Sequence, residues 1–293
     1  MSAPPHIFTL TGNLLAEHTL EFEAWTPGRT QRARRETFQV GGKGINVSKM
    51  LRRLGVAHTA LAFTGGATGR ACEEWLRAQG FACRLFATAT PTRRGIVVRD
   101  HSGAHPETTF LGSDSPPDAA ALQVCAAFLE AQPDGQVLAL CGSFPGWASP
   151  DAAPLRAALH RWARRGALVA DTYGPPLADL VAAPLALLKI NADEARTLPA
   201  GNSAALPTSL QRWIVTDGPR AVRLRDGANA EETLLPPVVR EVSPTGSGDV
   251  LLAAVLESIF IRGRPLREAV DAALPLAAAN AAHPGIADFP LSL

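Results

Sequence analysis

Short runs of apolar residues alternate along the chain with longer segments whose apolar positions recur at helical spacing. This pattern predicts short strands at 56–63, 136–140, 167–170 and 185–190. It predicts helices at 70–79 and 151–165, each followed by a glycine that can end a helix, Gly80 and Gly166. Short buried strands separated by helices are typical of a parallel sheet with helices on both faces, so we expect an α/β fold.

Two features depart from this alternation. Residues 214–216 and 221–225 flank Asp217-Gly218 and could pair as a hairpin. The stretches near 6–40 and 86–112 read as extended segments with charged interruptions and few helix signals. We interpret these two excursions as a small β appendage that covers a single large domain spanning residues 1–293.

Composition and charge limit the classes of function. The 293 residues are 46% apolar, which is enough for a substantial core, and a net charge of +1 gives no electrostatic reason to expect nucleic acid or a membrane surface as a partner. The longest apolar run, 250–256, is too short to cross a bilayer. Four scattered cysteines form no C-x-x-C pair, and residues 1–13 lack the pattern of a signal peptide. We therefore expect a cytoplasmic protein.

A first glycine-rich segment, Gly41-Gly42-Lys43-Gly44-Ile45-Asn46, leads into an amphipathic helix that stops at Gly55. Three glycines within four residues let the backbone approach a ligand closely and adopt positive φ. Lys43 and Asn46 add a cation and an amide at the start of the helix, where the macrodipole contributes a positive partial charge. The segment therefore favours a binding site at the helix start.

A second glycine-rich segment, Thr245-Gly246-Ser247-Gly248-Asp249, precedes a helix that is apolar on almost every side and should be buried. Consecutive amides at a helix N-terminus bind anions, because unpaired N–H groups and the helix dipole both favour negative charge. A carboxylate beside such a site is costly unless it has a chemical role. Next to a phosphoryl group in transfer, Asp249 can accept a proton from the attacking hydroxyl while the neighbouring amides stabilise the developing charge.

Neither segment fits the commonest nucleotide-binding motifs. Lys43 is followed by Gly44 where a Walker A loop needs Ser or Thr, and Gly246 and Gly248 lack the third glycine of G-x-G-x-x-G. A Rossmann-type dehydrogenase is disfavoured, since no dinucleotide fingerprint follows an early strand. Each segment alone could be a tight turn before a helix, but the two together on one chain are a more specific indication of a binding site.

Together with three further segments, they resemble the PfkB carbohydrate kinase family, also called ribokinase-like. The two glycine-rich segments are similar to the family's two signatures, with Ser247 where Ala is usual. Segments similar to its S-G-S-L-P, I-K-P-N-x-x-E and V-T-x-G patterns stand between them in the family's order: Cys141-Gly142-Ser143-Phe144-Pro145, Leu188-Lys189-Ile190-Asn191-Ala192-Asp193-Glu194 and Val215-Thr216-Asp217-Gly218. The resemblance implies a three-layer α/β/α ribokinase-like domain with a mainly parallel sheet and a β-sheet lid.

The resemblance also implies an ATP-dependent kinase and a role for each matching residue. Asp249 would be the catalytic base, and the amides of Gly246, Ser247 and Gly248 would form the anion hole. Mg²⁺ would be held by Asn191 and Glu194, and the ATP site would be lined by Lys189, Asn191, Thr216, Gly218 and Asn280. The acceptor would contact Gly42, Lys43, Asn46 and Ser143. Without the family, the Asn191-x-x-Glu194 spacing is also that of a helix capping box.

Within the family, the chain looks most like the 1-phosphofructokinase and tagatose-6-phosphate kinase branch, through residues 63–69, 171–174 and 92–93. This likeness implies that Arg93 contacts the phosphate of a sugar phosphate. The chain departs from the branch's usual residues at Glu17, Gly95, Thr109 and Ser243. Glu17 stands where an acceptor-binding Asp is expected, so the acceptor side is altered while the phosphoryl-transfer residues are intact.

Two alternatives remain open at this point. The chain could be a kinase for an unphosphorylated sugar or a nucleoside, or a non-catalytic sensor of sugars or nucleotides that kept the fold. In each case the partner is a small molecule. An extended β lid would also leave strand edges that a second copy could cover, so we expect a homodimer formed through the lid.

Overall fold

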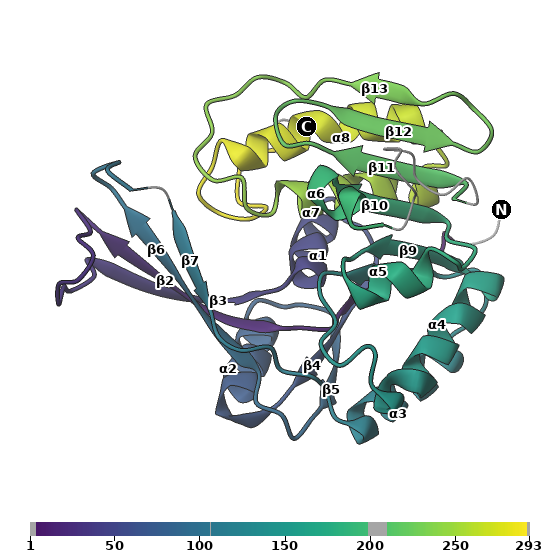
Figure 1. Ribbon diagram of the computed structural model, residues 1–293, viewed down its shortest axis with the longest axis horizontal. Helices are drawn as coiled ribbons and strands as arrows, with labels where there is room; N and C mark the ends of the chain where they lie inside the picture. The colour runs from purple at the N-terminus through teal and green to yellow at the C-terminus, as the bar shows by residue number, and fades with distance from the viewer. Residues whose placement is uncertain (1–3, 106, 199–209, 292–293) are drawn as a thin grey trace.

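The computed structural model describes residues 4–105, 107–198 and 210–291. Part of the N-terminal segment 1–13 and residue 106 of the second predicted excursion lie outside the described residues. The described chain forms a nine-stranded sheet with the strand order β13-β12-β11-β10-β9-β8-β1-β4-β5 (Figure 1). All neighbours from β5 to β11 pair in parallel, whereas β12 and β13 extend the sheet in antiparallel fashion.

The strands of this main sheet are β1 (Ile7–Thr11), β4 (His58–Thr64), β5 (Cys83–Ala87), β8 (Val137–Cys141), β9 (Ala167–Asp171), β10 (Leu187–Asn191), β11 (Arg212–Thr216), β12 (Val222–Asp226) and β13 (Glu232–Leu234). The predicted strands at 56–63, 136–140, 167–170 and 185–190 are β4, β8, β9 and β10. The predicted hairpin is the antiparallel pair β11–β12.

Helices cover both faces of the main sheet. One face carries α3 (Ala119–Glu130), α4 (Ala153–Arg165), α5 (Pro175–Leu180) and α6 (Ala192–Arg196). The other carries α1 (Lys43–Arg53), α2 (Gly66–Ala78), α7 (Ser247–Leu256) and α8 (Leu266–Ala281). The predicted helices 70–79 and 151–165 are α2 and α4, the latter preceded by a 3₁₀ turn at Pro150–Ala152. The expected three-layer α/β/α architecture is confirmed.

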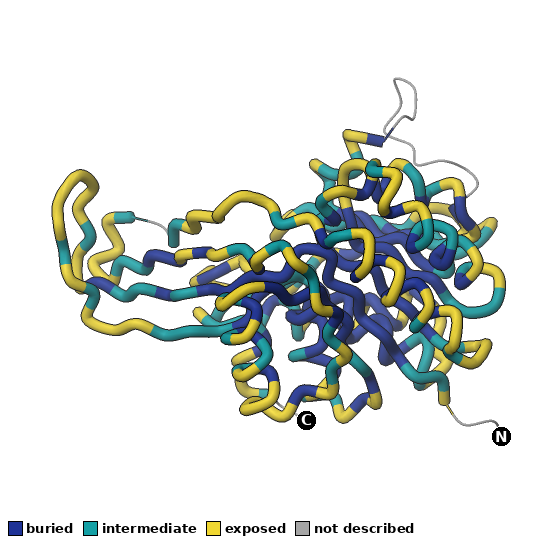
Figure 2. The backbone as a smooth tube through the Cα atoms, turned by 90° about the horizontal axis from the view of Figure 1, so that it is seen from below, coloured by how far each residue is buried: buried dark blue, intermediate teal, exposed yellow. Residues whose placement is uncertain are grey.

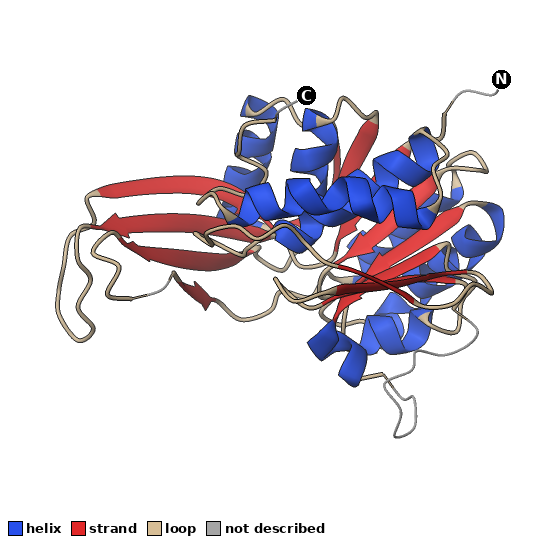
Figure 3. Cartoon of the chain, turned by 90° about the horizontal axis from the view of Figure 1, so that it is seen from above, coloured by secondary structure: helices blue, strands red, loops and turns tan. Residues whose placement is uncertain are grey.

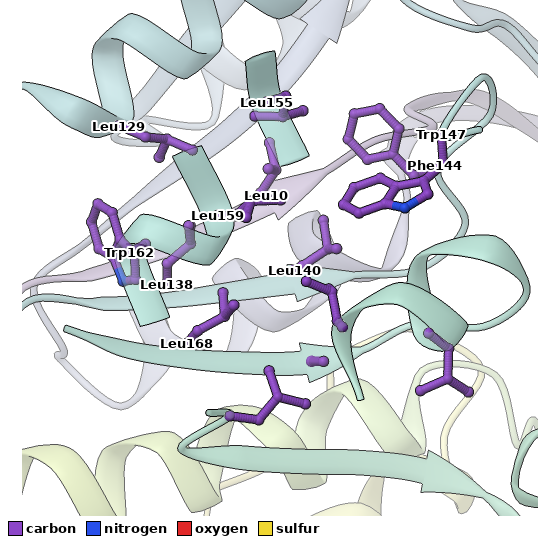
Figure 4. Packing of buried hydrophobic residues seen from close by; sticks show 14 of the residues in the cluster. Leu10, Leu129, Leu138, Leu140, Phe144, Trp147, Leu155, Leu159, Trp162 and Leu168 are labelled. Atoms are coloured by element: carbon purple, nitrogen blue, oxygen red, sulfur yellow. The ribbon is translucent and has the colours of Figure 1, made fainter. Parts of the chain in front are cut away.

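The core explains why the strands read as short apolar runs. Leu138 and Leu140 of β8 pack in one cluster with residues of α4, whereas Val137 and Ala139 belong to the cluster on the opposite face. Figure 4 shows the first cluster, in which Leu138 of β8 lies beside Leu159 of α4. A strand buried on both faces has no polar side, so its sequence does not alternate.

A second sheet of four strands, in the order β3-β2-β6-β7, projects from the main body (Figure 3). Its strands are β2 (Leu15–Phe22), β3 (Arg35–Gly41), β6 (Arg93–Asp100) and β7 (Thr108–Leu111). Burial falls along these strands away from the main sheet, from Gly41 to the exposed Arg35 in β3 (Figure 2). The small sheet is therefore anchored at one end and open to solvent at the other.

The start of each predicted excursion is wrong. Residues 7–11, expected in the appendage, form β1 inside the main sheet, between β8 and β4, and residues 86–87 belong to β5. All five residues of β1 are buried, as a strand between two helical layers requires. The threonines of β1 gave it a polar character typical of a one-sided sheet, but they are buried too: the Thr9 hydroxyl pairs with that of Ser48 across 2.8 Å.

The parallel register gathers the strand ends at one edge of the main sheet. Thr11 lies opposite Cys141, Cys141 opposite Asp171, and Asn191 opposite Thr216. Ligands of open α/β sheets bind beyond these carboxyl ends. Within the described ranges, no helix combines the length and the hydropathy that a membrane span needs.

Candidate active site

A cavity of about 710 Å³ lies between the carboxyl edge of the main sheet and the small sheet. Most of the predicted site residues line it: Glu17, Gly42, Lys43, Asn46, Arg93, Lys189, Asn191, Thr216, Gly218, Gly246, Ser247, Gly248 and Asp249. Three described residues of the predicted set, Ser143, Glu194 and Asn280, are not part of the lining. The fold thus brings both glycine-rich segments to one cavity.

The second glycine-rich segment turns sharply into α7. Gly246 adopts φ +80° and ψ −5°, the left-handed region, and a Cβ there would come within 2.5 Å of the Ile286 side chain. Glycine is the residue that meets both conditions without strain. The Ser247 amide donates to the carbonyl oxygen of Pro244 across 3.2 Å. One of the three amides expected in the anion hole is therefore engaged within the turn.

A buried charge cluster stands behind this helix start. Asp171, at the end of β9, accepts hydrogen bonds from Nζ of Lys43 and Nζ of Lys189, each across 2.9 Å. Burial alone would raise the pKa of Asp171, but the two ammonium groups hold it below its ordinary value. A Cβ on Gly248 would lie 2.7 Å from Nζ of Lys189. The absence of a side chain at Gly248 therefore lets the ammonium approach the backbone of α7.

Asp171 is a residue that sequence reasoning matched to a family pattern without giving it a role. The available signal was a carboxylate at the end of an otherwise apolar strand, which is costly to bury unless it is paired. The pairing itself depends on β10 and α1, which only the fold brings alongside. Burial also lowers the pKa of Lys43, but Asp171, Asp249 and Glu194 together raise it well above its ordinary value.

Asp249 lies in the first turn of α7 and is 5% exposed. Its Oδ2 accepts a hydrogen bond from Nδ2 of Asn46 across 2.8 Å. Burial raises the pKa of Asp249 to about 6; Lys43 and Lys189 oppose this shift and Asp171 adds to it. A carboxylate with this pKa is ionised at neutral pH and is a stronger base than an ordinary Asp, which suits proton abstraction.

The segment from Asn191 to Glu194 forms the capping box that its spacing also predicted. Oδ1 of Asn191 accepts from the Glu194 amide and Oε2 of Glu194 accepts from the Asn191 amide, both across 2.8 Å. The other carboxylate oxygen, Oε1, lies 3.4 Å from Nζ of Lys43. Thr216 and Gly218 line the cavity nearby, at and just after the end of β11.

Asn280 is fully buried in α8. Its Nδ2 donates to the Thr245 carbonyl oxygen across 2.9 Å and approaches Oγ of Ser247 at 3.2 Å, while its Oδ1 accepts from the Ala287 amide across 2.8 Å. Asn280, expected at the ATP site, does not line the cavity. The side chain instead fixes the turn that precedes α7, and a buried amide with several partners is typical of such a bracing role.

Glu17 is buried in β2, with 8% exposure. Its carboxylate accepts a hydrogen bond from Nε2 of Gln39 on β3, and Oε1 of Gln39 accepts from Nζ of Lys49 across 3.0 Å. A Cβ on Gly41 would lie 3.2 Å from Oε2 of Glu17, so the carboxylate reaches the first glycine-rich segment. Burial lowers the pKa of Lys49 to about 8, against the opposing effect of Glu17.

Of the other departures from the sugar-phosphate kinase branch, Gly95 lies opposite Glu17 in the small sheet, and Thr109 and Ser243 line the cavity. A Cβ on Gly95 would meet Cδ1 of Leu15 at 2.9 Å, so the small residue fits the packing between β2 and β6. Thr109 lines the cavity from β7. Ser243 is buried, and its hydroxyl lies 3.2 Å from Oε1 of Glu107.

Arg93 begins β6 and is held by two oxygens. Its Nη1 lies 3.4 Å from Oδ1 of Asp114, and its Nη2 donates to the Asn13 carbonyl oxygen across 3.3 Å. Oγ of Ser143 accepts from Nδ2 of Asn13 across 3.0 Å. The predicted acceptor residues Arg93 and Ser143 are thus connected through Asn13, to which the sequence analysis gave no role.

The two-sheet architecture and a buried carboxylate beside a glycine-rich helix start define the class of ribokinase-like kinases. The crystal structure of phosphofructokinase-2 from Escherichia coli in complex with fructose-6-phosphate has the same fold, with a TM-score of 0.84, 20% sequence identity and 94% of each chain covered. Residues 12–292 match the pfkB family carbohydrate kinase model, and the chain belongs to this family. Membership implies ATP as the co-substrate and a sugar hydroxyl as the acceptor.

Individual relatives are more distant over their whole length. The chain is 24% identical to a 1-phosphofructokinase of Borreliella burgdorferi, over 97% of this chain and 94% of that protein. It is 44% identical to a D-tagatose-1-phosphate kinase of Bacillus licheniformis over 70 residues, which are 24% of this chain and only 23% of that relative. The second match is therefore a local one.

Proposed function

We propose that the protein transfers the γ-phosphoryl group of ATP to a hydroxyl of a sugar phosphate, as its 1-phosphofructokinase relatives do by name. The observation that carries this proposal is the position of Asp249, a buried carboxylate in the first turn of α7 that lines the cavity between the two sheets. In phosphoryl transfer a protein contributes mainly positioning and charge stabilisation, and this cavity has groups for both.

Asp249 acts as the general base in this proposal. One of its carboxylate oxygens takes the proton of the acceptor hydroxyl while the hydroxyl oxygen bonds to the γ-phosphorus. The bond from that phosphorus to the β–γ bridging oxygen breaks, and ADP leaves with the electron pair. The backbone of Gly246 to Gly248 and the ammonium of Lys189 stabilise the charge on the migrating group. Gly42, Lys43 and Asn46 hold the acceptor, and Ser143, outside the cavity lining, acts through its hydrogen bond with Asn13.

Magnesium fits the residues on the nucleotide side. Mg²⁺ is commonly bound by one or two carboxylates together with waters and phosphate oxygens. Among the described residues, Lys43 at 3.4 Å is the one hydrogen-bond partner of Oε1 of Glu194, so this oxygen can accept a further ligand. Asn191 lines the cavity beside it. Glu194 and Asn191 would hold the ion, which when bound neutralises charge on the phosphates. Lys189, Thr216 and Gly218 would contact ATP.

Two observations support a phosphorylated acceptor. Arg93 lines the cavity, and a guanidinium is well matched to a phosphate dianion. The names of the relatives, 1-phosphofructokinase and D-tagatose-1-phosphate kinase, describe enzymes that act on sugar phosphates. One observation favours an unphosphorylated sugar instead: Asp114 already lies against Arg93.

A homodimer through the small sheet is also proposed. Pairing register aligns Phe38, His18, Ile96 and Phe110 in one row across its four strands. The adjacent row, Gln39, Glu17, Gly95 and Leu111, lies on the cavity side, and alternate residues point to opposite faces. Ile96 and Phe110 are 41% and 52% exposed. A second copy would cover this apolar row.

Coupled ADP detection tests the proposed function. The panel contains ATP·Mg²⁺ with fructose 1-phosphate, tagatose 1-phosphate, tagatose 6-phosphate, fructose 6-phosphate and the corresponding free sugars. We expect ADP with at least one sugar phosphate, and a loss of about 10²- to 10⁴-fold in kcat for Asp249→Asn. Turnover of free sugars alone would favour the unphosphorylated acceptor. Binding of sugar and nucleotide without any ADP would instead indicate a sensor.

A further inference from the structure

Three segments of the chain at the junction of the two sheets meet at one point. Asn13 lies between β1 and β2, Arg93 begins β6 after β5, and Asp114 lies between β7 and α3. Nδ2 of Asn13 donates to Oδ1 of Asp114 across 2.8 Å, and Nη1 of Arg93 lies 3.4 Å from the same oxygen. Two hydrogen-bond donors from separate chain segments therefore converge on one carboxylate oxygen.

The donors at this point are buried, whereas the anion is not. Asn13 is 4% exposed and the Arg93 side chain 13%, but the Asp114 side chain is 63% exposed. Nε of Arg93 and Oδ1 of Asn13 are buried atoms without a hydrogen-bond partner in the part of the chain that the structure describes. Buried polar atoms are normally paired, so the unused Nε–H of Arg93 indicates a ligand with an accepting oxygen at this position. Oδ1 of Asn13 is itself an acceptor, so it would pair with a donor and not with a phosphate oxygen.

Arg93 lies at the acceptor end of the cavity, and Asp114 lines a second hollow together with Ser143. Arg93 lies in register with Leu15, two residues before Glu17, and both Leu15 and Glu17 line the same cavity as Arg93. The donors at the convergence point are a guanidinium and a carboxamide, which suit the oxygens of a phosphate monoester. The carboxylate of Asp114 thus stands where such a group would bind.

We propose that Asp114 is a specificity-determining residue: its carboxylate occupies the anion position formed by Arg93 and Asn13, and a phosphorylated acceptor must displace it. This inference rests on the proposed function, because it concerns the acceptor of the same reaction. With Asp114 in place, the dianionic acceptor competes with an internal anion, whereas a neutral sugar does not. An exposed ion pair contributes little to folding, so the carboxylate can be removed without loss of the fold.

Asp114→Asn tests the proposal, since it keeps the size of the side chain and an oxygen that accepts from Asn13 but removes the charge. Isothermal titration calorimetry measures the Kd of inorganic phosphate and of fructose 1-phosphate for the wild type, Asp114→Asn, Arg93→Ala and the double variant. We expect Asp114→Asn to lower both Kd values about three- to fivefold, as for an exposed ion pair, and to have no effect in the Arg93→Ala background.

Asp134→Asn is the matched control. It removes another exposed carboxylate, 78% exposed and 2.9 Å from Nη1 of Arg165, at a surface that does not line the cavity. The Kd values should then equal those of the wild type. Equal Kd values for the wild type and Asp114→Asn overturn the proposal. So does an equal gain in the Arg93→Ala background, because a general reduction of negative charge would then explain it.

Steady-state kinetics separate this inference from the proposed function. If the wild type forms no ADP with any sugar phosphate, but Asp114→Asn still tightens phosphate binding in an Arg93-dependent way, the proposed function fails and the anion position stands. If the wild type forms ADP and Asp114→Asn leaves the KM of the sugar phosphate unchanged, the kinase function stands and Asp114 has no role in selecting the acceptor.

Discussion

Nδ2 of Asn46 donates a hydrogen bond to Oδ2 of Asp249 across 2.8 Å, although the two residues are 203 positions apart. Asn46 lies in the first turn of α1 and Asp249 in the first turn of α7, and both side chains are buried. This bond joins the two glycine-rich segments into one site. It also makes the proton affinity of the Asp249 carboxylate depend on Asn46 in the first segment.

Asn46→Ala is expected to shift the acid limb of the kcat–pH profile to higher pH. The hydrogen bond from Asn46 lowers the pKa of Asp249, so its loss raises that pKa above about 6 and the base is protonated at a higher pH. A hydrogen bond to a charged group corresponds to a shift of about one pH unit. Asn229→Ala, on the exposed turn after β12, is the control. An unshifted limb in Asn46→Ala would separate Asp249 from the rate-limiting ionisation.

Asp249→Asn should stabilise the fold at neutral pH while it removes turnover. The folded-state pKa of about 6 lies above the ordinary 3.8, so between these values the folded protein retains a proton that the unfolded chain has lost. The free energy of unfolding of the wild type therefore falls as pH rises from 4 to 6, by about 2–3 kcal/mol. The free energy of unfolding of Asp249→Asn should not show this decrease.

Urea unfolding at pH 4 and at pH 7.5 measures this difference. The advantage of Asp249→Asn should be small at pH 4, where the carboxyl is largely protonated in the folded state, and fully present at pH 7.5. An advantage of the same size at both values would mean that burial of the charge is not its cause.

Gly246→Ala should lower kcat strongly, because the residue sets the start of α7. The substitution places a Cβ at φ +80° and against the Ile286 side chain, so the turn must shift. A displacement of about 1 Å at a reacting centre can cost about 10²-fold in rate. Gly263→Ala is the matched control, since Gly263 has φ +68° and nothing within 4 Å of its added Cβ. It should lose only about 1 kcal/mol of stability and no activity.

Ile96→Glu should convert the proposed dimer to a monomer. Ile96 lies in the exposed row on the outer face of the small sheet, where a buried charge in an interface is unfavourable. Light scattering after size exclusion should give about twice 30.8 kDa for the wild type and 30.8 kDa for the variant. Val124→Glu changes an equally exposed apolar residue on α3 and should leave the mass unchanged. A monomeric wild type would exclude this interface.

Local signals predicted the parts of the site that depend on backbone conformation. The glycines before α1 and α7 marked helix starts at which a ligand was expected, and both segments line the cavity. The pairing of the buried charges was less predictable. Asp171 gave only the signal of a carboxylate at the end of an apolar strand, and its two lysine partners lie on α1 and β10. The burial of Asn280 was not predictable either, because the position of an amide along a helix does not say which face is buried.

The sequence by itself determined the α/β class, the two glycine-rich helix starts and the identity of Asp249 as the carboxylate beside them, because spacing and backbone freedom are local properties of a chain. Only the tertiary structure decided that β1 lies inside the main sheet between β8 and β4, that Lys43 and Lys189 share Asp171, and that Asp114 meets Arg93. These are contacts between distant segments. Their free energies depend on burial and on the distance between the groups, and the parallel pairing of the strands sets both.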